Sequence, residues 1–379
     1  MRHDPEADRF RSQVRALLRI PEPAAPRPAP RHRARTETST HDRRIYTALG
    51  ARGWLAPHWP PAWGGQGSGW SHSAVVAEEL ALHGVSDTAL VNTVYNFGEC
   101  LRRIGTPGQQ ADHLPRIAAG ELVAAVLFTE PGAGSDLATL TTTATRRDGG
   151  WVLSGTKTWS AQTDLAELAL CAARTSGDNG RGPGITLFLV PLDTAGVRVE
   201  PLHTINPEPL HQVLLDQVEL TDHAVIGAVG GAWPTISHLL SVERASLGYH
   251  GRARRWFGAL LDRCRATGAL ADPAVTARLS TLDTDLAAAG ELAWRAVYDL
   301  DETGATGVAA AVSKWRNTEL GAEIVRYYFE LDGMGAVLTG GLSEVAFRES
   351  AGLTLAAGTS EVMLTLAGTH LRDLLDEAG

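Results

Sequence analysis

The spacing of apolar residues changes twice along this 379-residue chain, and that change is the strongest constraint on its fold. Residues 39–118 carry apolar positions at helical spacing. Short β-type runs separated by glycine-rich turns follow, from about residue 121 to residue 220. From about residue 230 to residue 377 the helical spacing returns, over alanine- and leucine-rich stretches long enough for a bundle. Short strands between two helical segments favour a small antiparallel barrel or sandwich flanked by helices.

We therefore predict an α+β protein with an N-terminal helical domain at residues 1–119, a middle β domain at 120–228 and a C-terminal helical domain at 229–379. Within the first domain, residues 7–20 have the spacing of a short amphipathic helix. The proline-rich segment at 21–30 breaks regular structure after it.

The composition of the chain argues against some classes of binding partner and location. The formal net charge of -9 argues against a general nucleic-acid surface, because phosphate binding needs clustered positive charge. No apolar run is long enough to span a membrane, and the N-terminal residues lack the apolar segment of a secretory signal. We therefore expect a soluble protein of the cytoplasm.

The cysteines and histidines predict neither a disulfide framework nor a metal site. Cys100, Cys171 and Cys264 are far apart and form no CxxC pair. Only two lysines occur, Lys157 and Lys314, which we interpret as the bias of a GC-rich genome rather than a functional feature. Four histidines without metal-ligand spacing are interpreted as surface or core residues: His203, His211, His223 and His250.

The most informative stretch is residues 128–137, which read Phe-Thr-Glu-Pro-Gly-Ala-Gly-Ser-Asp-Leu. A predicted strand leads into it, and Gly132 and Gly134 allow the backbone to approach a flat ligand closely. Amide and hydroxyl groups at such a turn suit the edge of a flavin ring. The glycine spacing alone is more typical of an ordinary turn that leaves a strand.

The full string is more specific than its glycines. It resembles the signature of the acyl-CoA dehydrogenase family, and the resemblance continues through Gly-Thr-Lys-Thr-Trp at 155–159. It implies an N-terminal helical domain, a small β-barrel middle domain and a C-terminal four-helix bundle. It also implies FAD as cofactor and oxidation of an acyl thioester between its α and β carbons. The resemblance covers roughly residues 40–370, with further matching segments at 53–57, 105–110, 114–115, 331–335 and 358–362.

The resemblance also implies the residues of a site. In this family the strand before the Thr-Glu-Pro turn binds the flavin, and a serine, here Ser135, lies along the pantetheine arm of the thioester. Without the resemblance, Trp159 would be read as a core aromatic, and Thr359 with Glu361 as an N-cap pair that opens the last helix. The implied flavin contacts are Val126, Phe128, Thr129, Trp159, Ser160, Ala161, Gly333, Thr359 and Glu361.

Four features depart from the family's pattern. Ala357 stands where a common form of the family has its catalytic glutamate, and Ala161 stands where many relatives have Thr or Ser bonded to flavin N5. The Arg-x-x-Phe-Gly motif, with which relatives hold the partner subunit's FAD pyrophosphate, is absent from residues 263–279. Phe329 stands where relatives often have a flavin-contacting glutamine.

Glu243 is the candidate base for the α-proton. Some relatives supply this glutamate in a Glu-Arg pair on the first long C-terminal helix, and Glu243-Arg244 is such a pair. We expect Glu243 to open that helix, with a pKa that burial raises toward neutral, and Arg244 to position the site. The backbone N–H of Ala357, with a ribityl hydroxyl of FAD, would bind the thioester oxygen. The alternative is a solvated glutamate near a helix start, stabilised by the helix dipole.

Substrate and assembly stay open at this level. Acyl-CoA and acyl carrier protein present the same pantetheine arm, and electron-transfer flavoprotein is one candidate acceptor. Two other functions fit the departures: a flavin monooxygenase on the same fold, and a non-catalytic subunit of a heteromeric dehydrogenase. The Ala/Leu-rich helices predicted at 279–330 need cover, so we expect a homodimer or homotetramer, with a heteromer as the alternative.

Overall fold

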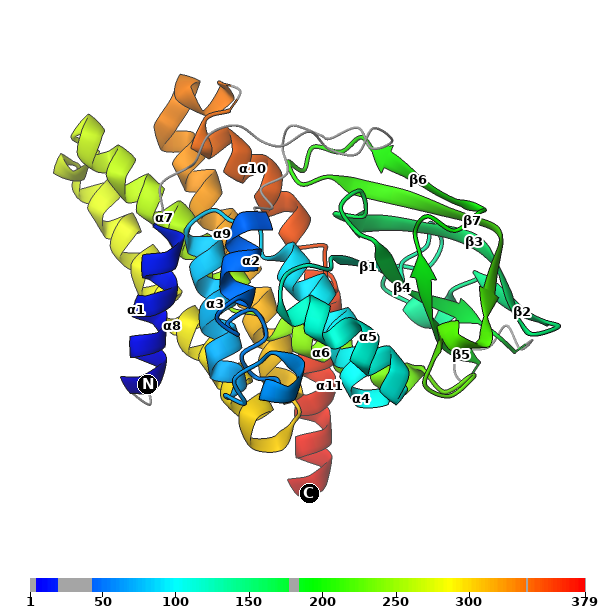
Figure 1. Cartoon of the computed structure of the whole chain (residues 1–379). Coiled ribbons are helices and arrows are strands. Elements are labelled where there is room, and N and C mark those ends of the chain that lie inside the picture. The colour runs from blue at the N-terminus through cyan, green and yellow to red at the C-terminus, as the bar shows by residue number, and fades with distance from the viewer. Residues whose placement is uncertain (1–4, 20–42, 177–183, 339, 379) are drawn as a thin grey trace.

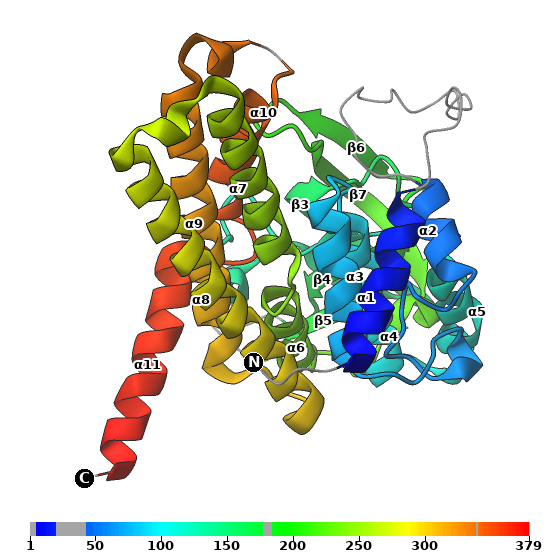
Figure 2. The ribbon, with the colours of Figure 1, turned by 90° about the vertical axis from the view of Figure 1, so that its left-hand side faces the viewer.

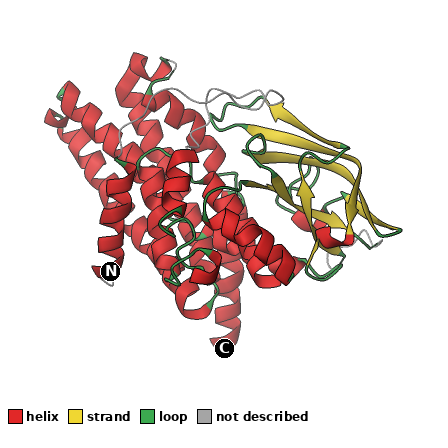
Figure 3. Ribbon diagram, in the orientation of Figure 1, coloured by secondary structure: helices red, strands yellow, loops and turns green. Residues whose placement is uncertain are grey.

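The computed structural model describes residues 5–19, 43–176, 184–338 and 340–378, and its helical and β regions follow the predicted order (Figure 3). Helices form one side of the molecule and the sheet forms the other, with α4 and α5 next to the sheet (Figure 1). The predicted α+β class is confirmed. The proline-rich segment at 21–30 lies outside the described residues.

The N-terminal helical region ends at Ala118, and its last helix begins at a capping box. The Thr106 hydroxyl accepts a hydrogen bond from the Gln109 N–H at 3.2 Å, and the Gln109 side chain accepts one from the Thr106 N–H at 3.0 Å. One segment, η2, is a π-helix, which periodicity does not distinguish from an α-helix. The elements are α1 (Pro5–Leu18), α2 (Arg43–Gly50), the 3-10 turn η1 (Pro61–Trp63), α3 (Trp70–Leu82), η2 (Leu90–Gly98), α4 (Glu99–Ile104) and α5 (Pro107–Ala118).

The middle region is a mixed sheet with the strand order β6-β7-β3-β2-β4-β5-β8. Most neighbours are antiparallel, as predicted, while β1 runs parallel to β4 with Ala124 opposite Leu168. Trp151 and Phe188 meet edge to face in its core, with ring centroids 5.7 Å apart. The strands are β1 (Ala124–Leu127), β2 (Thr143–Arg147), β3 (Gly150–Ala161), β4 (Leu168–Arg174), β5 (Ile185–Pro191), β6 (Val197–Leu202), β7 (Leu210–Thr221) and β8 (Val225–Ile226), with 3-10 turns η3 (Leu137–Thr139) and η4 (Asp222–Ala224).

In the C-terminal region, α7, α8, α9 and α10 share one apolar core that contains Trp256, Leu282, Ile324 and Ala346. Among the described residues, no helix combines the length and apolar character needed to cross a membrane. The elements are α6 (Trp233–Arg244), α7 (Gly248–Thr267), η5 (Ala269–Ala271), α8 (Pro273–Thr303), α9 (Gly307–Asp332), η6 (Gly333–Val337), α10 (Leu342–Leu353) and α11 (Ser360–Ala378).

The last helix, α11, packs on α9 at its start and then extends away from the body of the molecule (Figure 2). Four of its leucines are exposed: Leu364, Leu366, Leu371 and Leu375. Leu279, Leu282, Leu286 and Leu320 of the segment at 279–330 lie in the chain's own core, so the exposed apolar surface that an oligomer would cover is on α11.

Candidate active site

Strand β1 brings the predicted flavin-contacting residues to one place in the β domain. β1 pairs with β4, and carbonyl groups of β1 and of the residues just after it accept hydrogen bonds from β3. The Ser160 hydroxyl donates to the Val126 carbonyl at 2.9 Å, and the Thr158 N–H donates to the Thr129 carbonyl at 3.0 Å. The structure thus gathers six of the predicted residues along β1 and β3: Val126, Phe128, Thr129, Trp159, Ser160 and Ala161.

A buried ion pair fixes the turn that follows β1. The ammonium group of Lys157 lies 2.8 Å from Glu130 Oε1 and also donates to the Phe128 carbonyl at 3.1 Å, and both charged side chains are almost fully buried. Glu130 further accepts from the N–H groups of Thr141 and Thr142 at 2.6 and 2.8 Å. Burial disfavours its ionised form, but the charge and hydrogen bond of Lys157 outweigh burial and lower the pKa of Glu130 to about 2.

Trp159 occupies a β-bulge in β3 and is not a core aromatic. The pairing of β3 with β7 shifts register between Lys157 and Ser160, which leaves Trp159 without a partner on β7. Its φ is 59°, in the left-handed region, and its side chain is 57% exposed. A bulky residue in this conformation costs on the order of 1–3 kcal/mol, and such strain concentrates at ligand sites. The bulge therefore directs the indole outward from the sheet.

The turn that contains Gly132 and Gly134 has free space around both glycines. A Cβ added at Gly132 or Gly134 would meet no atom within 4 Å, so packing within the chain does not require these glycines. Ser135 is exposed on the same turn. An outward indole next to an open turn of amides and hydroxyls fits a flat, polar-edged ring system such as a flavin. Val126, Phe128, Thr129, Ser160 and Ala161 would hold it.

Glu243 lies at the C-terminal end of α6, which corrects the prediction that it opens a long helix. α6 ends at Arg244, and α7 begins at Gly248, where a Cβ would come within 1.7 Å of Asp87 Oδ2. The helix dipole at a C-terminus disfavours a carboxylate, so the alternative of a dipole-stabilised glutamate is also wrong. Burial raises the pKa of Glu243, as predicted, and the Asn96 hydrogen bond and the Arg244 and Lys314 charges offset this only in part.

The π-helix η2 connects Glu243 with strand β1. Asn96 donates from Nδ2 to Glu243 Oε2 at 3.4 Å. One turn earlier, the Thr93 hydroxyl accepts from the N–H of Ala124, the first residue of β1, at 3.0 Å. π-Helical segments are rare and recur at functional sites. The candidate base and the start of β1 therefore lie on two neighbouring turns of one element.

Arg244 and Lys314 hold the backbone around Ala357. Arg244 Nε donates to the Ala357 carbonyl at 3.1 Å, and Lys314 Nζ donates to the Gly358 carbonyl at 2.7 Å. Both turn residues have positive φ, 56° at Ala357 and 97° at Gly358. Glu243, Arg244 and Ala357, predicted together from the sequence, are thus brought together.

Of the remaining predicted flavin contacts, Thr359 and Glu361 lie next to this turn, whereas Gly333 lies at the far end of the bundle. The Thr359 hydroxyl accepts from the Val362 N–H at 3.3 Å, so the predicted N-cap of α11 is present beside Gly358. Glu361 lies in the first turn of α11 and is exposed. Gly333 follows the end of α9, roughly 28 Å along that helix from Lys314, so it does not join the group around Glu243.

Comparison with known proteins identifies the family. Models of three acyl-CoA dehydrogenase domains match the chain: the N-terminal domain at 4–121, the middle domain at 125–218 and the C-terminal domain at 230–371. Acyl-CoA dehydrogenase IpdE1 of Mycobacterium tuberculosis is 33% identical, over 75% of this chain and 75% of its own length. The chain belongs to the acyl-CoA dehydrogenase family. Members of this family are FAD-dependent oxidoreductases, so FAD is the cofactor, as predicted.

Two further acyl-CoA dehydrogenases are similar to the chain. FadE34 of M. tuberculosis is 35% identical over 86% of this chain, which spans only 45% of the length of FadE34. A solved structure described as the Tcur3481-Tcur3483 steroid ACAD is 27% identical, with a TM-score of 0.85 and coverage of 98% of both chains.

Side chains fill the end of α9 where the sequence of this chain departs from the family's pattern. Phe329 packs against Phe347 with ring centroids 4.8 Å apart. Arg263 Nε lies 2.8 Å from Asp332 Oδ1, so the charge of this arginine is paired within the chain. Arg263 belongs to the segment 263–279, from which the Arg-x-x-Phe-Gly motif is absent. This end of the chain therefore presents stacked aromatics and a paired arginine.

Sequence reasoning missed Asn96, and it gave Lys157 and Lys314 no role. Asn96 had no local signal, because π-helical geometry has no composition of its own. The two lysines did have a signal in the sequence, namely their rarity. In a chain that uses arginine almost everywhere, both lysines are fully buried, each with its ammonium group on a backbone carbonyl of the site.

Proposed function

We propose that this chain catalyses FAD-dependent α,β-dehydrogenation of an acyl thioester, with Glu243 as the base that accepts the α-proton. The observation that carries the proposal is that Glu243 and Arg244 are adjacent residues, and Arg244 holds the carbonyl of Ala357. A carboxylate of raised pKa therefore lies beside the turn to which the family resemblance assigns the thioester oxygen.

Each group would have a separate task. When bound, FAD supplies the acceptor for the β-hydride. The Glu243 carboxylate accepts the α-proton, and the Ala357 N–H orients the thioester carbonyl and stabilises the charge that develops on its oxygen. Trp159 and the β1–β3 residues orient the cofactor and exclude water from one of its faces. Ser135, exposed at the edge of the turn, contacts the pantetheine arm.

Substitution of the base tests this proposal. Glu243→Gln keeps the shape of the side chain and removes its proton acceptor, so flavin reduction by a thioester should slow about a hundredfold or more while FAD stays bound. The measurement is stopped-flow bleaching of flavin absorbance. Glu219→Gln, at an exposed glutamate of β7, is the matched control and should reduce its flavin at the wild-type rate. Wild-type bleaching in Glu243→Gln would contradict the assignment.

The substrate is proposed only as a class. Similarity to a protein described as a steroid ACAD supports thioesters with large polycyclic acyl groups as the first panel, offered both as acyl-CoA and on a carrier protein. Electron-transfer flavoprotein is the acceptor to assay first. Oxygen consumption by the reduced flavin, without thioester oxidation, would favour the monooxygenase alternative. A cytoplasmic location stays a prediction.

A heteromeric dehydrogenase is the second candidate, and the end of α9 favours it. Relatives use the Arg-x-x-Phe-Gly motif to hold the FAD pyrophosphate of a partner subunit, and this chain has Phe329 against Phe347 and Arg263 paired with Asp332 near that end. In such an assembly this chain would receive those FAD contacts from a different chain. Purification of the chain alone, followed by its flavin-to-protein ratio, tests this: full occupancy in a homo-oligomer excludes the need for a second chain.

A further inference from the structure

Lys314 is a fully buried cation that the reaction described above does not use. It lies on α9, and its side chain has no exposed surface. Burial and the charge of Arg244 lower its pKa to about 8, while the carboxylates of Glu243, Glu319 and Glu361 oppose that shift. It is therefore mostly charged at neutral pH, and a charge is costly to bury unless the structure uses it.

Three polar side chains from two helices hold the turn at residues 357–360. Arg244 from α6 holds the Ala357 carbonyl at 3.1 Å, and Lys314 from α9 holds the Gly358 carbonyl at 2.7 Å. One turn further along α9, Glu319 accepts a hydrogen bond from the Ser360 hydroxyl at 2.5 Å. The turn between α10 and α11 is thus fixed from the side of the bundle.

The turn needs this support because its backbone is strained. Ala357 has a φ of 56°, a left-handed conformation that is unfavourable for an alanine. Gly358 has a φ of 97°, and a Cβ there would lie 2.6 Å from Met363 Cε. Without a donor on the Gly358 carbonyl, the peptide between Gly358 and Thr359 could rotate. The left-handed backbone of Ala357 and Gly358 could then relax toward an ordinary conformation and redirect the N–H groups of the turn.

Lys314 also acts on Glu243 through its charge. The groups that face Glu243 come from several elements: Asn96 on η2, Arg244 on α6, Tyr249 on α7 and Lys314 on α9. Burial raises the pKa of Glu243, whereas the positive charges of Arg244 and Lys314 lower it. Lys314 therefore limits how far the pKa of this carboxyl rises.

We propose that Lys314 is a positioning residue for α-proton removal: it holds the Gly358 carbonyl so that the Ala357–Gly358 backbone stays directed at the thioester, and its charge keeps Glu243 available as a carboxylate. This inference rests on the proposed dehydrogenase function. Lysine suits the task because a single ammonium group on a narrow stem reaches one carbonyl in a closed space, where a guanidinium would need partners for five N–H groups.

Two substitutions separate the hydrogen bond from the charge. Lys314→Met removes both, and Lys314→Gln keeps a donor for the Gly358 carbonyl but has no charge. Arg316→Met, on the same helix and paired at the surface with Asp285, is the matched loss of a cation. All are made in the full chain with FAD bound. The first measurement is the limiting rate of flavin reduction, and the second is the pH at which this rate falls on the acid side of its pH profile, called the acid limb. The third is hydrogen exchange of the peptide at 354–363 before any thioester is added.

Lys314→Met should exchange faster at 354–363 and reduce its flavin about tenfold to a hundredfold more slowly at saturating thioester, with a smaller change in thioester affinity. Its acid limb should move to higher pH, because Glu243 loses a charge that favours ionisation. Lys314→Gln should show the same shift of the acid limb with exchange close to wild type. If Lys314→Met does not fold, the acid limb of Lys314→Gln decides the matter. Arg316→Met should match wild type in all three.

Two failures are distinguishable. If the wild-type flavin is reduced and the Lys314 variants match wild type in rate, acid limb and exchange, the inference about Lys314 is overturned and the proposed function stands. If no acyl thioester reduces the wild-type flavin, the proposed function fails, and with it the role in proton removal. Hydrogen exchange at 354–363 then still decides whether Lys314 orders the turn.

Discussion

At the scale of residues, the site is held by groups in conformations or environments that are costly for them. Trp159 and Ala357 have left-handed backbones, and Glu243 is a carboxyl whose pKa burial raises at the C-terminal end of a helix. Lys157 and Lys314 are cations without exposure. Each of these costs stability, and together they position the indole, the candidate base and the backbone of the 357–360 turn.

The raised pKa of Glu243 predicts that the base itself destabilises the fold at neutral pH. A carboxyl whose pKa is higher folded than unfolded stabilises the fold below its unfolded pKa, near 4.3, and that stability is lost as the pH rises through the folded pKa. Glu243→Gln should therefore melt at a higher temperature than wild type at pH 8, with little difference at pH 4. Thermal melts at both pH values check this, and an equal difference at both would contradict it.

Residue types in the sequence predicted most of the site, but not its backbone geometry. The string from Phe128 to Leu137, with Trp159, predicted the residues that the structure gathers along β1 and β3, because a strand and its glycine turn are local. Glu243 was placed at the wrong end of a helix, since α6 ends at Arg244 and α7 begins only at Gly248, where Asp87 of a distant segment lies too close for a Cβ. Asn96 and Lys314 reach the site through long-range contacts, which no local pattern contains.

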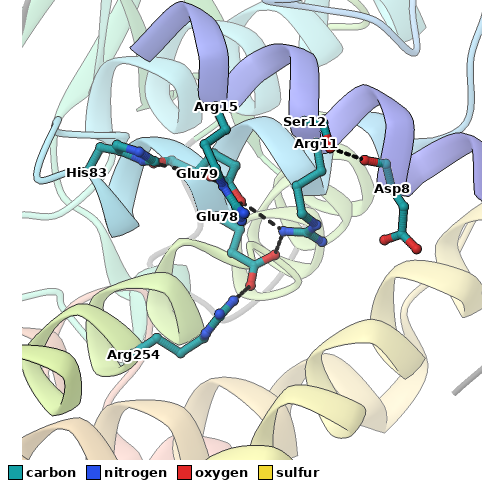
Figure 4. Close-up of polar contacts among 8 residues, drawn as sticks. All are labelled: Asp8, Arg11, Ser12, Arg15, Glu78, Glu79, His83 and Arg254. Carbon is teal, nitrogen blue, oxygen red and sulfur yellow. Dashed lines mark hydrogen bonds and ion pairs between the residues drawn. The ribbon is translucent and has the colours of Figure 1, made fainter. Parts of the chain in front are cut away.

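At the scale of elements, α1 is attached to the rest of the chain by ion pairs around two buried glutamates. Arg11 and Arg15 project from α1 toward Glu78 and Glu79 on α3, and Arg254 approaches Glu78 from α7 (Figure 4). Arg15 binds Glu79 through two nitrogens at 3.0 and 2.8 Å. The apolar face of α1 supplies the rest of the contact, through residues such as Phe10.

Removal of one charge should loosen α1 selectively. Glu79 is buried, which raises its pKa, but the hydrogen bonds and charges of Arg15 and Arg11 outweigh burial and lower it overall. Glu79→Gln should cost about 1–3 kcal/mol at pH 7, between the values for surface and buried pairs, because Arg15 is partly exposed. The loss should shrink as the pH falls from the unfolded pKa through the lowered folded pKa of Glu79, because the unfolded chain binds the proton first and the folded carboxyl of the wild type is then protonated as well.

Denaturant unfolding and hydrogen exchange test this prediction. Exchange should rise in α1 while α8 keeps its wild-type protection. Glu200→Gln, at an exposed residue of β6, is the control and should leave both unchanged. Equal loosening of α1 and α8 would show that these ion pairs stabilise the whole chain rather than the attachment of one helix.

At the scale of the whole molecule, the leucines of α11 form apolar surface that contacts within a single chain leave exposed. Leu371 and Leu375 are 61% and 73% exposed on a helix that extends away from the body (Figure 2). The expected oligomer would cover this stripe. The sequence indicated the helices at 279–330 as the surface to be covered, since composition cannot show which leucine-rich helix packs within the chain.

We predict that a double substitution, Leu371→Glu with Leu375→Glu, lowers the mass of the assembly without unfolding the chain. Two carboxylates on this stripe would be costly to bury in any interface. Light scattering at micromolar concentration gives the mass, and circular dichroism verifies the fold. Glu substitutions at Thr365 and Thr369, exposed on the same helix, serve as the control for added charge. A wild-type chain that is already a monomer would refute the prediction.

The burial of both lysines has a chemical consequence for a protein that handles activated acyl groups. Thioesters acylate free amines without a catalyst, and lysine side chains are the usual targets on a protein surface. Here no lysine amine meets solvent, because the only two are enclosed beside Phe128 and Gly358 while arginines supply the surface cations. The folded chain is in this sense inert toward spontaneous acylation of its side-chain amines by its own proposed substrates, and unfolding would end that protection.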